Sequence, residues 1–321
     1  MRVAVLSGGV SPEHEVSLSS GRSVEAGLIE AGHEPVEVLI TKDGRWTHQG
    51  ASVDLTPRGG LLDCDVAFPV LHGPGGEDGT VQAVFEVLDI AYVGSGVEAS
   101  AVCMDKLALK AVAASLGIAQ VPYLEAFAGQ PMPEQVADLG LPIWVKPAHG
   151  GSSVGISRVE DLSEFERAVA LAASMDSRVI VESNASGKEV ECSVLGNRDL
   201  TTSSPGELRV NSDWYDYETK YEEGGMDLVI PAEIPSAVQE RVQTLAAEIF
   251  RITGCEGMAR CDFFVLDDQI LLNEVNTIPG FTPTSVYAKL LEHSGITYPA
   301  LCSRLLELAV EAKTGRDSQR S

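Results

Sequence analysis

The stretch "MARCDFFVLDDQILLNEVNTIPGF", residues 258–281, decides the fold. Two apolar runs, "CDFFVL" and "ILLNEV", flank the polar segment "DDQ", a pattern typical of a β-hairpin. A three-residue "DDQ" loop would pair Asp262 with Glu274 on opposite strands. Because side chains alternate across a strand, these carboxylates would share one face with Arg260 and Asn276. The intervening apolar residues would be buried on the other face.

The polar face of this hairpin has the composition of a metal site. Like charges directly opposite each other destabilise a hairpin unless a cation lies between them. Two carboxylates and an amide oxygen are hard ligands of the kind that Mg²⁺ prefers, with nucleotide phosphates and water completing the octahedron. An ordinary solvated polar face is the alternative, and the apolar opposite face favours the metal. We therefore expect Asp262, Glu274 and Asn276 to hold metal.

A glycine-rich segment, "KPAHGGSSVGI" at residues 146–156, directly follows the apolar stretch "LPIWV". It matches neither the Walker loop nor the dinucleotide-binding loop. The residues after its serines return to a strand pattern, so we expect this loop at the tip of a β-hairpin. It is either a plain turn, which the segment alone favours, or a phosphate loop with Lys146 as a fixed positive charge. The metal hairpin downstream favours the phosphate loop.

Composition excludes several classes of protein. The chain has 321 residues, 44% hydrophobic and 22% charged, which is typical of a folded protein of two or three domains. A net charge of −24 argues against general nucleic-acid binding, so any phosphate site would be a local island of positive charge. No apolar run approaches the length of a membrane span, and the six cysteines include no C-x-x-C pair. We expect a soluble, cytoplasmic protein that binds neither nucleic acid nor membranes.

Strand and helix signals alternate in the first part of the chain. Four short apolar runs are typical of strands: residues 3–8, 35–40, 65–70 and 91–95. This alternation predicts a parallel sheet with crossover helices. Ser20 is a candidate cap for the first helix, and Ser100 for the helix that opens a second domain.

Several motifs together carry a resemblance to a known family. The segments "VKPAHGGSSVG", "RCDFFV" and "LNEVNTIPG" resemble the ATP-grasp superfamily, in which two α+β domains hold ATP and magnesium between their sheets. Over nearly its whole length the chain resembles D-alanine:D-alanine ligases. The further matches are "LSGGVSPEHEVS", "LHGPGGEDGTVQ", "GSGVEASAVCMDKL" and "DWYDYETKY". The resemblance implies an N-terminal parallel α/β domain (residues 1–97), then two ATP-grasp domains (98–185 and 186–321) with ATP between them.

The resemblance also implies a reaction. ATP phosphorylates the carboxylate of one D-alanine, and the amino group of a second D-alanine attacks the acyl phosphate. The products are D-alanyl-D-alanine for peptidoglycan precursors, ADP and phosphate. The implied cofactors are ATP and two Mg²⁺ ions, which Mn²⁺ could replace, and the implied assembly is a homodimer.

Nucleotide and metal residues follow by motif position. The resemblance assigns ATP contacts to Lys106, Lys146, Ser152, Ser153, Glu182, Glu189 and Lys220. It assigns the two magnesium ions to Asp262, Glu274 and Asn276. The chain departs from the family at Ser183, where a lysine is common beside the adenine, and we leave Ser183 out of the site. His149 lies at a variable place in the loop and receives no role.

Substrate residues follow in the same way. The resemblance assigns Glu13 to the ammonium of the first D-alanine and Ser285 to the carboxylate of the second. Arg260 and the Gly280 backbone N–H match the oxyanion donors. His72 lies near substrate in the family.

Tyr221 bears on which product is made. The resemblance groups Tyr221 with Ser152 and Glu13 in a hydrogen-bonded set, and tyrosine at this place favours the dipeptide over a D-lactate ester.

Each substrate assignment has a structural alternative. Glu13 could simply begin a helix, Ser285 could cap one, and Arg260 could pair with Asp262 or Glu274. His72 could be a satisfied loop histidine, and Tyr221 could pack in a lid. A non-catalytic nucleotide-binding module, another ATP-grasp ligase and a dinucleotide oxidoreductase are the competing functions. The metal ligands, the substrate motifs and the missing dinucleotide fingerprint disfavour them in turn.

Overall fold

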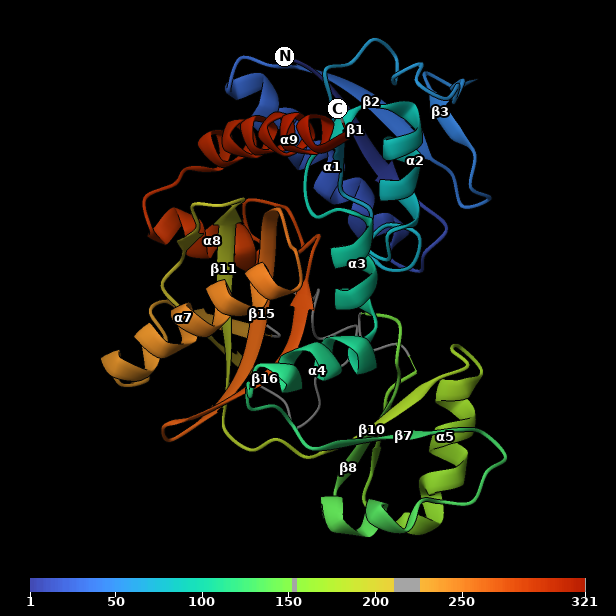
Figure 1. The fold of residues 1–321 in the computed structure, drawn as a ribbon, viewed down its shortest axis with the longest axis vertical. Helices are drawn as coiled ribbons and strands as arrows, with labels where there is room; N and C mark the ends of the chain where they lie inside the picture. Colours follow the sequence, from blue (N-terminus) through green and yellow to red (C-terminus); the bar gives the residue numbers. More distant parts are fainter. Residues whose placement is uncertain (152–154, 211–225, 321) are drawn as a thin grey trace.

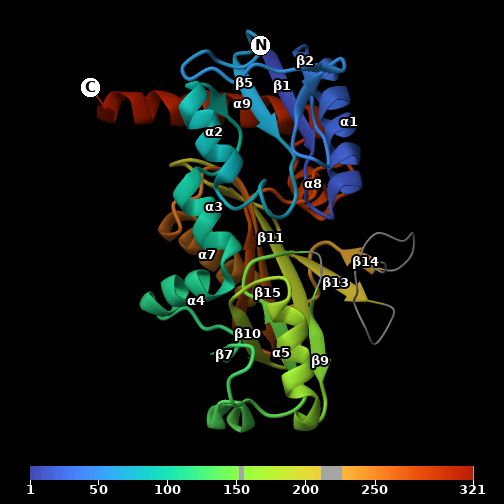
Figure 2. The ribbon, with the colours of Figure 1, turned by 90° about the vertical axis from the view of Figure 1, so that its right-hand side faces the viewer.

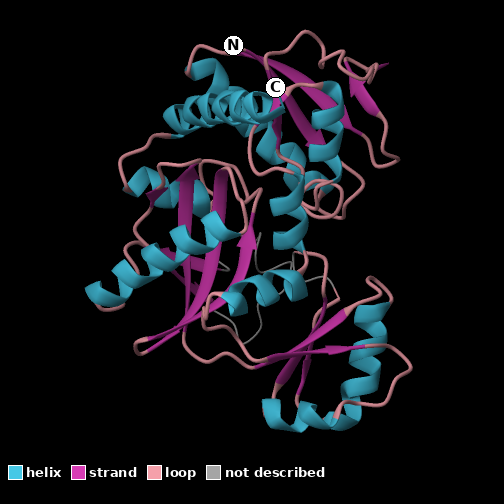
Figure 3. Cartoon of the chain, in the orientation of Figure 1, coloured by secondary structure: helices cyan, strands magenta, loops and turns pink. Residues whose placement is uncertain are grey.

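A computed structural model describes residues 1–151, 155–210 and 226–320. Three β-sheets with their covering helices make up these residues (Figures 1 and 3). No helix within the described ranges is both long and apolar enough to cross a membrane.

The first sheet has six strands in the order β4-β3-β2-β1-β5-β6. Their bounds are β1 (Arg2–Gly8), β2 (Glu34–Ile40), β3 (Trp46–His48), β4 (Ala51–Ser52), β5 (Val66–Pro69) and β6 (Ala91–Tyr92). β1 is parallel to β2 and β5, and β5 is parallel to β6. The predicted parallel sheet is therefore confirmed, with α1 (His14–Glu30) and α2 (Thr80–Leu88) in the connections. β3 and β4 add an antiparallel edge.

Helix α1 begins at His14, well before Ser20, so the predicted cap is wrong. Ser20 lies inside the helix and is fully buried. Its hydroxyl lies 3.0 Å from Nε2 of His72, so it bonds to another segment and does not cap the helix.

Two helices, α3 (Val97–Met104) and α4 (Lys106–Ser115), replace the single helix expected from Ser100. Asp105 separates them in an extended conformation. Its Oδ1 accepts backbone N–H bonds of 2.9 and 3.1 Å from the first turn of α4. This cap starts a new helix and places Lys106 at its first position.

The second sheet is antiparallel, in the order β7-β10-β8-β9. Its strands are β7 (Tyr123–Ala126), β8 (Ile143–Pro147), β9 (Ser157–Val159) and β10 (Val179–Ser183). Helix α5 (Phe165–Ala173) and the 3₁₀ turns η1 (Glu134–Leu139) and η2 (Leu162–Glu164) complete this unit. The paired strands β8 and β9 confirm that the glycine-rich loop tips a hairpin.

The third sheet follows the order β14-β13-β11-β15-β16, with β12 also paired to β11. Its strands are β11 (Lys188–Gly196), β12 (Thr201–Thr202), β13 (Gly206–Val210), β14 (Met226–Val229), β15 (Gly257–Leu266) and β16 (Gln269–Asn276). Helices α3, α4 and α7 (Ser236–Ile252) share one apolar core with one face of this sheet. On the opposite face, Leu195 and Met258 share a core cluster with residues of α8 (Val286–His293), whereas Arg260 and Asp262 are polar.

The last two helices are α8 (Val286–His293) and α9 (Tyr298–Arg320). α8 packs on β11, whereas α9 returns to the first sheet and packs against α1, β5 and β6. Figures 1 and 2 both show the red α9 beside the blue first sheet. Leu301 and Leu305 share one core cluster with Val3 and Val24, so the two ends of the chain bury each other's apolar surface.

Candidate active site

The hairpin β15–β16 pairs Asp262 with Glu274 and Arg260 with Asn276, as predicted. The predicted three-residue loop is wrong, because Leu266 pairs with Gln269 and leaves only two residues in the turn. A shift in register after Asp262 restores the predicted pairing, and it places Asn273 as an extra residue in β16.

The extra residue also decides which side chains face the core. In β16 the buried apolar positions are Ile270 and Leu272 before the shift and Val275 after it. Because the buried positions change from even to odd, Glu274 and Asn276 face the same side as Arg260 and Asp262. The predicted apolar face is confirmed, and it consists of Ala259, Cys261, Phe263 and Val265 in β15.

The polar face forms what we call the acidic cluster: Glu191, Arg260, Asp262, Glu274 and Asn276. Arg260 donates to both oxygens of Asp262, from Nε at 2.8 Å and from Nη2 at 2.7 Å. Its Nε also lies 2.9 Å from Oε2 of Glu191. The amide nitrogen of Asn276 donates to Oδ2 of Asp262 at 2.9 Å. Arg260 therefore contacts two carboxylates, those of Asp262 and Glu191.

The charges of the acidic cluster set the state of Arg260. Burial by itself would lower the pKa of Arg260, but Asp262, Glu191 and then Glu274 outweigh it and hold the pKa well above its usual value. The ion pair with Asp262, one of the two alternatives left by the sequence, is present. Arg260 therefore remains a fixed cation beside the carboxylates.

A second cluster, which we call the basic cluster, consists of Lys110, Lys146 and Glu182. Nζ of Lys110 lies 2.8 Å from Oε1 of Glu182, and Nζ of Lys146 lies 2.6 Å from Oε2. Lys110 and Glu182 are almost wholly buried, with side chains 1% and 3% exposed. Lys110 also donates to the carbonyl of Val121 at 3.4 Å and lies over the ring of Tyr123. Here two cations share one carboxylate.

The lysines keep Glu182 ionised despite its burial. Burial would raise the pKa of Glu182, but Lys146 and Lys110 outweigh it and lower the pKa to about 2. Burial likewise opposes the charge of Lys146, whereas Glu182, Glu274 and Glu189 raise its pKa. The effect of Glu274 on Lys146 links the basic cluster of the second sheet to the acidic cluster of the third.

The glycine-rich loop lies at the start of α4. Nζ of Lys106 donates to the carbonyl of Gly150 at 2.6 Å, and its backbone N–H donates to the carbonyl of Ala148 at 3.0 Å. The structure thus places Lys106 at the loop that carries Lys146 at its base. Ser152 and Ser153 of this loop lie outside the described residues. Lys220 and Tyr221 also lie outside them.

Glu13 lies where three segments of the chain meet. A Cβ placed on Gly73 would lie 2.6 Å from Oε2 of Glu13, and one on Gly151 would lie 3.7 Å from the same atom. Glu13 is buried at the residue that precedes α1. The predicted ammonium site therefore faces both the "HGPGG" segment and the glycine-rich loop.

His72 joins the first sheet to the segment that follows β16. Its Nδ1 lies 3.1 Å from the carbonyl of Ile278, so Nδ1 carries the proton, and Nε2 accepts from Ser20 at 3.0 Å. Burial lowers the pKa of His72 to about 4, partly offset by its bond to Ile278. Both ring nitrogens are satisfied within the protein, which matches the alternative of a satisfied histidine.

Gly280 and Ser285 lie together beyond this segment. A Cβ on Gly280 would lie 3.3 Å from Oγ of Ser285. Ser285 precedes α8, but its hydroxyl makes no cap bond to that helix. The hydroxyl instead accepts from the backbone N–H of Thr282 at 3.0 Å. The predicted oxyanion donor and the predicted carboxylate donor are therefore neighbours.

Comparison with known proteins identifies the family of this chain. Residues 112–307 match the family described as D-ala D-ala ligase C-terminus, and residues 2–60 and 51–95 match D-ala D-ala ligase N-terminus. A D-alanine–D-alanine ligase of Deinococcus radiodurans is 46% identical over 337 residues, covering 97% of this chain and 99% of that protein. The chain belongs to the D-alanine–D-alanine ligase family.

Solved structures of similar proteins share the fold. The VanG D-Ala:D-Ser ligase from Enterococcus faecalis has a TM-score of 0.87 at 33% identity, covering 96% of this chain and 99% of that chain. The D-alanine–D-alanine ligase from Bacillus anthracis complexed with ATP has a TM-score of 0.81 at 28% identity, covering 98% and 99%. The expected fold class, a parallel α/β domain followed by two ATP-grasp domains, is confirmed.

Two residues of the ligase site escaped the sequence reasoning. Lys110 interrupts the apolar positions of α4, and a lysine on an otherwise buried helix face signals a buried partner. Glu191 pairs directly across from Asp262 in β11, one strand before the hairpin. Polar residues at alternate positions 189 and 191 of that strand were the available signal.

Glu77 also escaped the sequence reasoning. It is half-buried, and it accepts from the backbone N–H of Gly73 at 2.7 Å and of Ile278 at 3.3 Å. Burial, with the charge of Glu13 next, raises the pKa of Glu77 to about 8. A carboxyl group that crosses from the first sheet to the segment after β16 could be found only from the tertiary structure.

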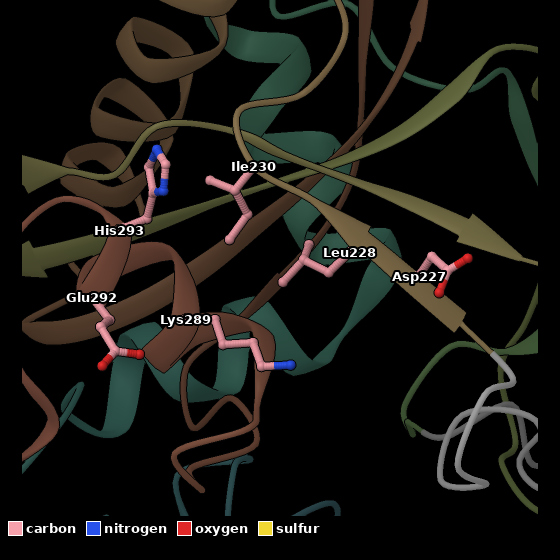
Figure 4. A pocket seen from close by; sticks show the side chains of 6 residues that line it. All are labelled: Asp227, Leu228, Ile230, Lys289, Glu292 and His293. Atoms are coloured by element: carbon pink, nitrogen blue, oxygen red, sulfur yellow. The ribbon is translucent and has the colours of Figure 1, made fainter.

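A separate pocket lies between β14 and α8 (Figure 4). Its lining consists of Asp227, Leu228, Ile230, Lys289, Glu292 and His293. None of the predicted site residues in the described ranges belongs to this lining.

Proposed function

We propose that this protein is an ATP-dependent ligase that joins two D-alanines to D-alanyl-D-alanine for peptidoglycan precursor synthesis. The observation that carries the proposal is the approach of two clusters of opposite excess charge. The basic cluster of the second sheet and the acidic cluster of the third interact through Lys146 and Glu274. A positive site suits phosphates and a negative site suits a metal ion, so the pair suits a metal-bound nucleotide.

ATP is assigned to the space between the two sheets. Lys106 and Lys146 would neutralise phosphate oxygens, and the support is their position beside Gly150 and Glu182. Ser152, Ser153 and Lys220 are assigned to the nucleotide from the family motifs alone. Glu189 is assigned to the ribose and Glu182 to the adenine. Both oxygens of Glu182 already contact lysines, so its share would be indirect.

The acidic cluster offers donors that fit magnesium. Asp262 and Glu274 supply carboxylates, and the Oδ1 of Asn276 is the atom that can coordinate, because its Nδ2 donates to Asp262. Within the described ranges, no three His, Cys, Asp or Glu side chains form a metal-binding group by themselves. Magnesium usually keeps water and phosphate ligands. Two bound Mg²⁺ ions, or Mn²⁺, would neutralise charge on the transferred phosphoryl group.

The first step activates the first D-alanine. Glu13 would bind its ammonium group, and this would turn the carboxylate toward the γ-phosphate of ATP. A carboxylate oxygen forms a bond to that phosphorus as the bond to ADP breaks. The arrangement of Glu13 against Gly73 and Gly151 supports this orientation. The residues position the reactants and neutralise charge, and no covalent enzyme intermediate is needed.

The second step joins the two amino acids. The amine of the second D-alanine, held through its carboxylate by Ser285, attacks the acyl carbon after losing a proton. Arg260 and the Gly280 N–H would stabilise the oxyanion until phosphate leaves. The support is the permanent charge of Arg260 and the proximity of Gly280 to Ser285. His72 would lie at the edge of this site, and Tyr221 would help select the amine.

The location and the assembly of the enzyme follow from the family resemblance alone. We infer a cytoplasmic homodimer built through the first sheet, as the family resemblance implies. Sedimentation of the purified chain would test the dimer.

Phosphate release and dipeptide formation test the proposed function directly. The purified protein is given ATP and Mg²⁺ with D-alanine alone, D-alanine plus D-lactate, D-alanine plus D-serine, or L-alanine. We expect phosphate and D-alanyl-D-alanine from D-alanine alone and neither from L-alanine. A D-serine product in excess would favour the specificity named for the Enterococcus structure. Absence of both phosphate and dipeptide with D-alanine would refute the proposal.

A further inference from the structure

His149 is fixed at the base of the glycine-rich loop by two contacts to one carboxylate. Its backbone N–H donates to Oδ2 of Asp176 at 2.7 Å, and its ring Nδ1 lies 2.9 Å from the same oxygen. Because an ionised carboxylate only accepts, Nδ1 carries a proton. Burial would raise the pKa of Asp176, but the bonds from His149 and Arg178 outweigh it and lower the pKa. The acceptor is therefore a permanent anion.

The other side of the imidazole faces the cap of α4. Nε2 of His149 lies 3.5 Å from Oδ2 of Asp105, and the two residues form an isolated antiparallel bridge. Asp105 uses its other oxygen to cap α4. Nη1 of Arg178 lies 2.6 Å from Oδ2 of Asp105, and its Nε lies 2.8 Å from Glu125. His149 thus lies between two carboxylates, with Arg178 and the first residue of α4 as the neighbouring cations.

The chain around His149 leads directly to the predicted phosphate ligands. Ala148 accepts a bond from the backbone of Lys106, and Gly150 accepts one from its Nζ. Gly150 has a φ of +134°, a conformation that residues other than glycine rarely adopt. Without a fixed neighbour, Gly150 and Gly151 could point their carbonyls in many directions, because glycine is conformationally free. We therefore expect His149, the residue before them, to fix where the Gly150 carbonyl meets Lys106.

We propose that His149 is a positioning residue for the nucleotide: it ties the glycine-rich loop to Asp176 and Asp105 so that Lys106 is held at the phosphate site. The inference rests on the proposed function, because it takes that site to bind ATP. The contacts of His149 are to Asp176 and Asp105, so we assign it no contact with substrate or reacting atoms. It acts through Gly150 and Lys106, so it affects nucleotide affinity more than the chemical step.

The test compares three variants at one position. His149→Ala removes the ring donor, whereas His149→Asn places an amide N–H near the position of Nδ1. We expect His149→Ala to raise the KM for ATP and the Kd for ADP with Mg²⁺ by about tenfold, with a much smaller change in kcat. His149→Asn should restore most of the affinity, and His149→Gln, which reaches toward Asp105 instead, should restore less. His48→Ala is the matched control, because that ring belongs to β3 of the first sheet, where its Nδ1 lies 2.7 Å from the backbone carbonyl of Glu37.

A double-mutant cycle separates positioning from general stability. Asp176→Ala alone should weaken ADP binding, and adding His149→Ala should weaken it little further, since both remove the same contact. ADP binding by calorimetry gives this readout even if no dipeptide forms, so failure of the proposed function is distinguishable. Unchanged ADP affinity in His149→Ala, or equal losses in the Ala and Asn variants, would overturn the inference.

Discussion

The basic and acidic clusters are both buried groups of charge, yet they are built with opposite balances. In the basic cluster, Lys110 and Lys146 share the single carboxylate of Glu182. In the acidic cluster, Arg260 serves Asp262 and Glu191 directly, and Glu274 also raises its pKa. Glu182, the one anion of the basic cluster, has both oxygens in contact with lysines. Arg260, the one cation of the acidic cluster, contacts carboxylates through both Nε and Nη2. Among the described residues, the basic cluster therefore holds more cations than anions, and the acidic cluster holds more anions than cations.

This difference teaches how a protein with a strongly negative net charge can hold a nucleotide. Burial makes such an excess of one charge costly unless opposite charge approaches it. In the proposed function, phosphates would complete the basic cluster and a metal ion would complete the acidic one. A magnesium nucleotide would supply both at once, which suits two clusters that interact through Lys146 and Glu274.

The largest expected effect comes from removing the one anion of the basic cluster. Glu182→Gln removes the one carboxylate that both Lys110 and Lys146 contact, so the free energy of unfolding should fall by about 3–5 kcal/mol. Urea unfolding monitored by fluorescence measures the change. Glu160→Gln, which breaks the exposed pair with Arg158, is the control and should unfold like the wild type. An unchanged midpoint for Glu182→Gln would mean that the lysines do not depend on this carboxylate.

Folding stability measured as a function of pH should separate the contribution of His72, which is neutral in the fold, from those of the charged clusters. The pKa of His72 is about 4 in the fold against an ordinary 6.5, so the unfolded chain takes up its proton first as the pH falls. Stability should therefore drop by about 3 kcal/mol between pH 6.5 and pH 4. His72→Gln should remove this part of the drop, whereas His48→Gln should not. Identical pH profiles for His72→Gln and wild type would contradict the buried neutral state.

The same measurement has a second, lower window from Glu182. Its folded pKa of about 2 lies below the ordinary 4.5, so its contribution is present above pH 4.5 and is lost as the pH falls toward 2. Glu182→Gln should flatten only this lower window.

In the acidic cluster, Asp262→Asn should lower turnover by about a hundredfold, or about 2.7 kcal/mol in the activation barrier. The amide removes a carboxylate ligand of the proposed metal but keeps the size of the side chain, so the fold should persist. Phosphate release at several Mg²⁺ concentrations measures the loss. Asp268→Asn in the exposed turn of the same hairpin is the control. A fully active Asp262→Asn enzyme would rule out the metal assignment.

The smallest effect concerns the excess charge of the basic cluster. Lys146→Gln leaves Lys110 paired with Glu182 and removes the surplus cation, so ADP should bind about tenfold more weakly with little loss of stability. Calorimetry of ADP with Mg²⁺ measures the affinity, and Lys313→Gln on α9 is the control. Equal affinity in both variants would show that Lys146 does not meet the phosphates.

The hairpin β15–β16 shows what could and could not be predicted from the sequence. The pairing of Asp262 with Glu274 was predicted correctly through a loop that was one residue too long, because the extra residue lies at Asn273 instead. The sequence does not mark that residue, because Leu271 is as apolar as its neighbours at 270 and 272. The turn does not mark it either, since an extra residue in the loop or at Asn273 gives the same pairing beyond it.

By itself, the sequence determined the four parallel strands of the first sheet, the glycine-rich hairpin, the shared polar face of residues 260–276 and the family. These follow from local periodicity and from motifs within single segments. Only the tertiary structure decided that α9 returns to the first sheet, that Lys110 and Glu191 join the site, and that His149 ties the loop to Asp176. Those contacts join residues far apart in the chain, and they form because buried charges and apolar faces must find partners wherever the folded chain brings them.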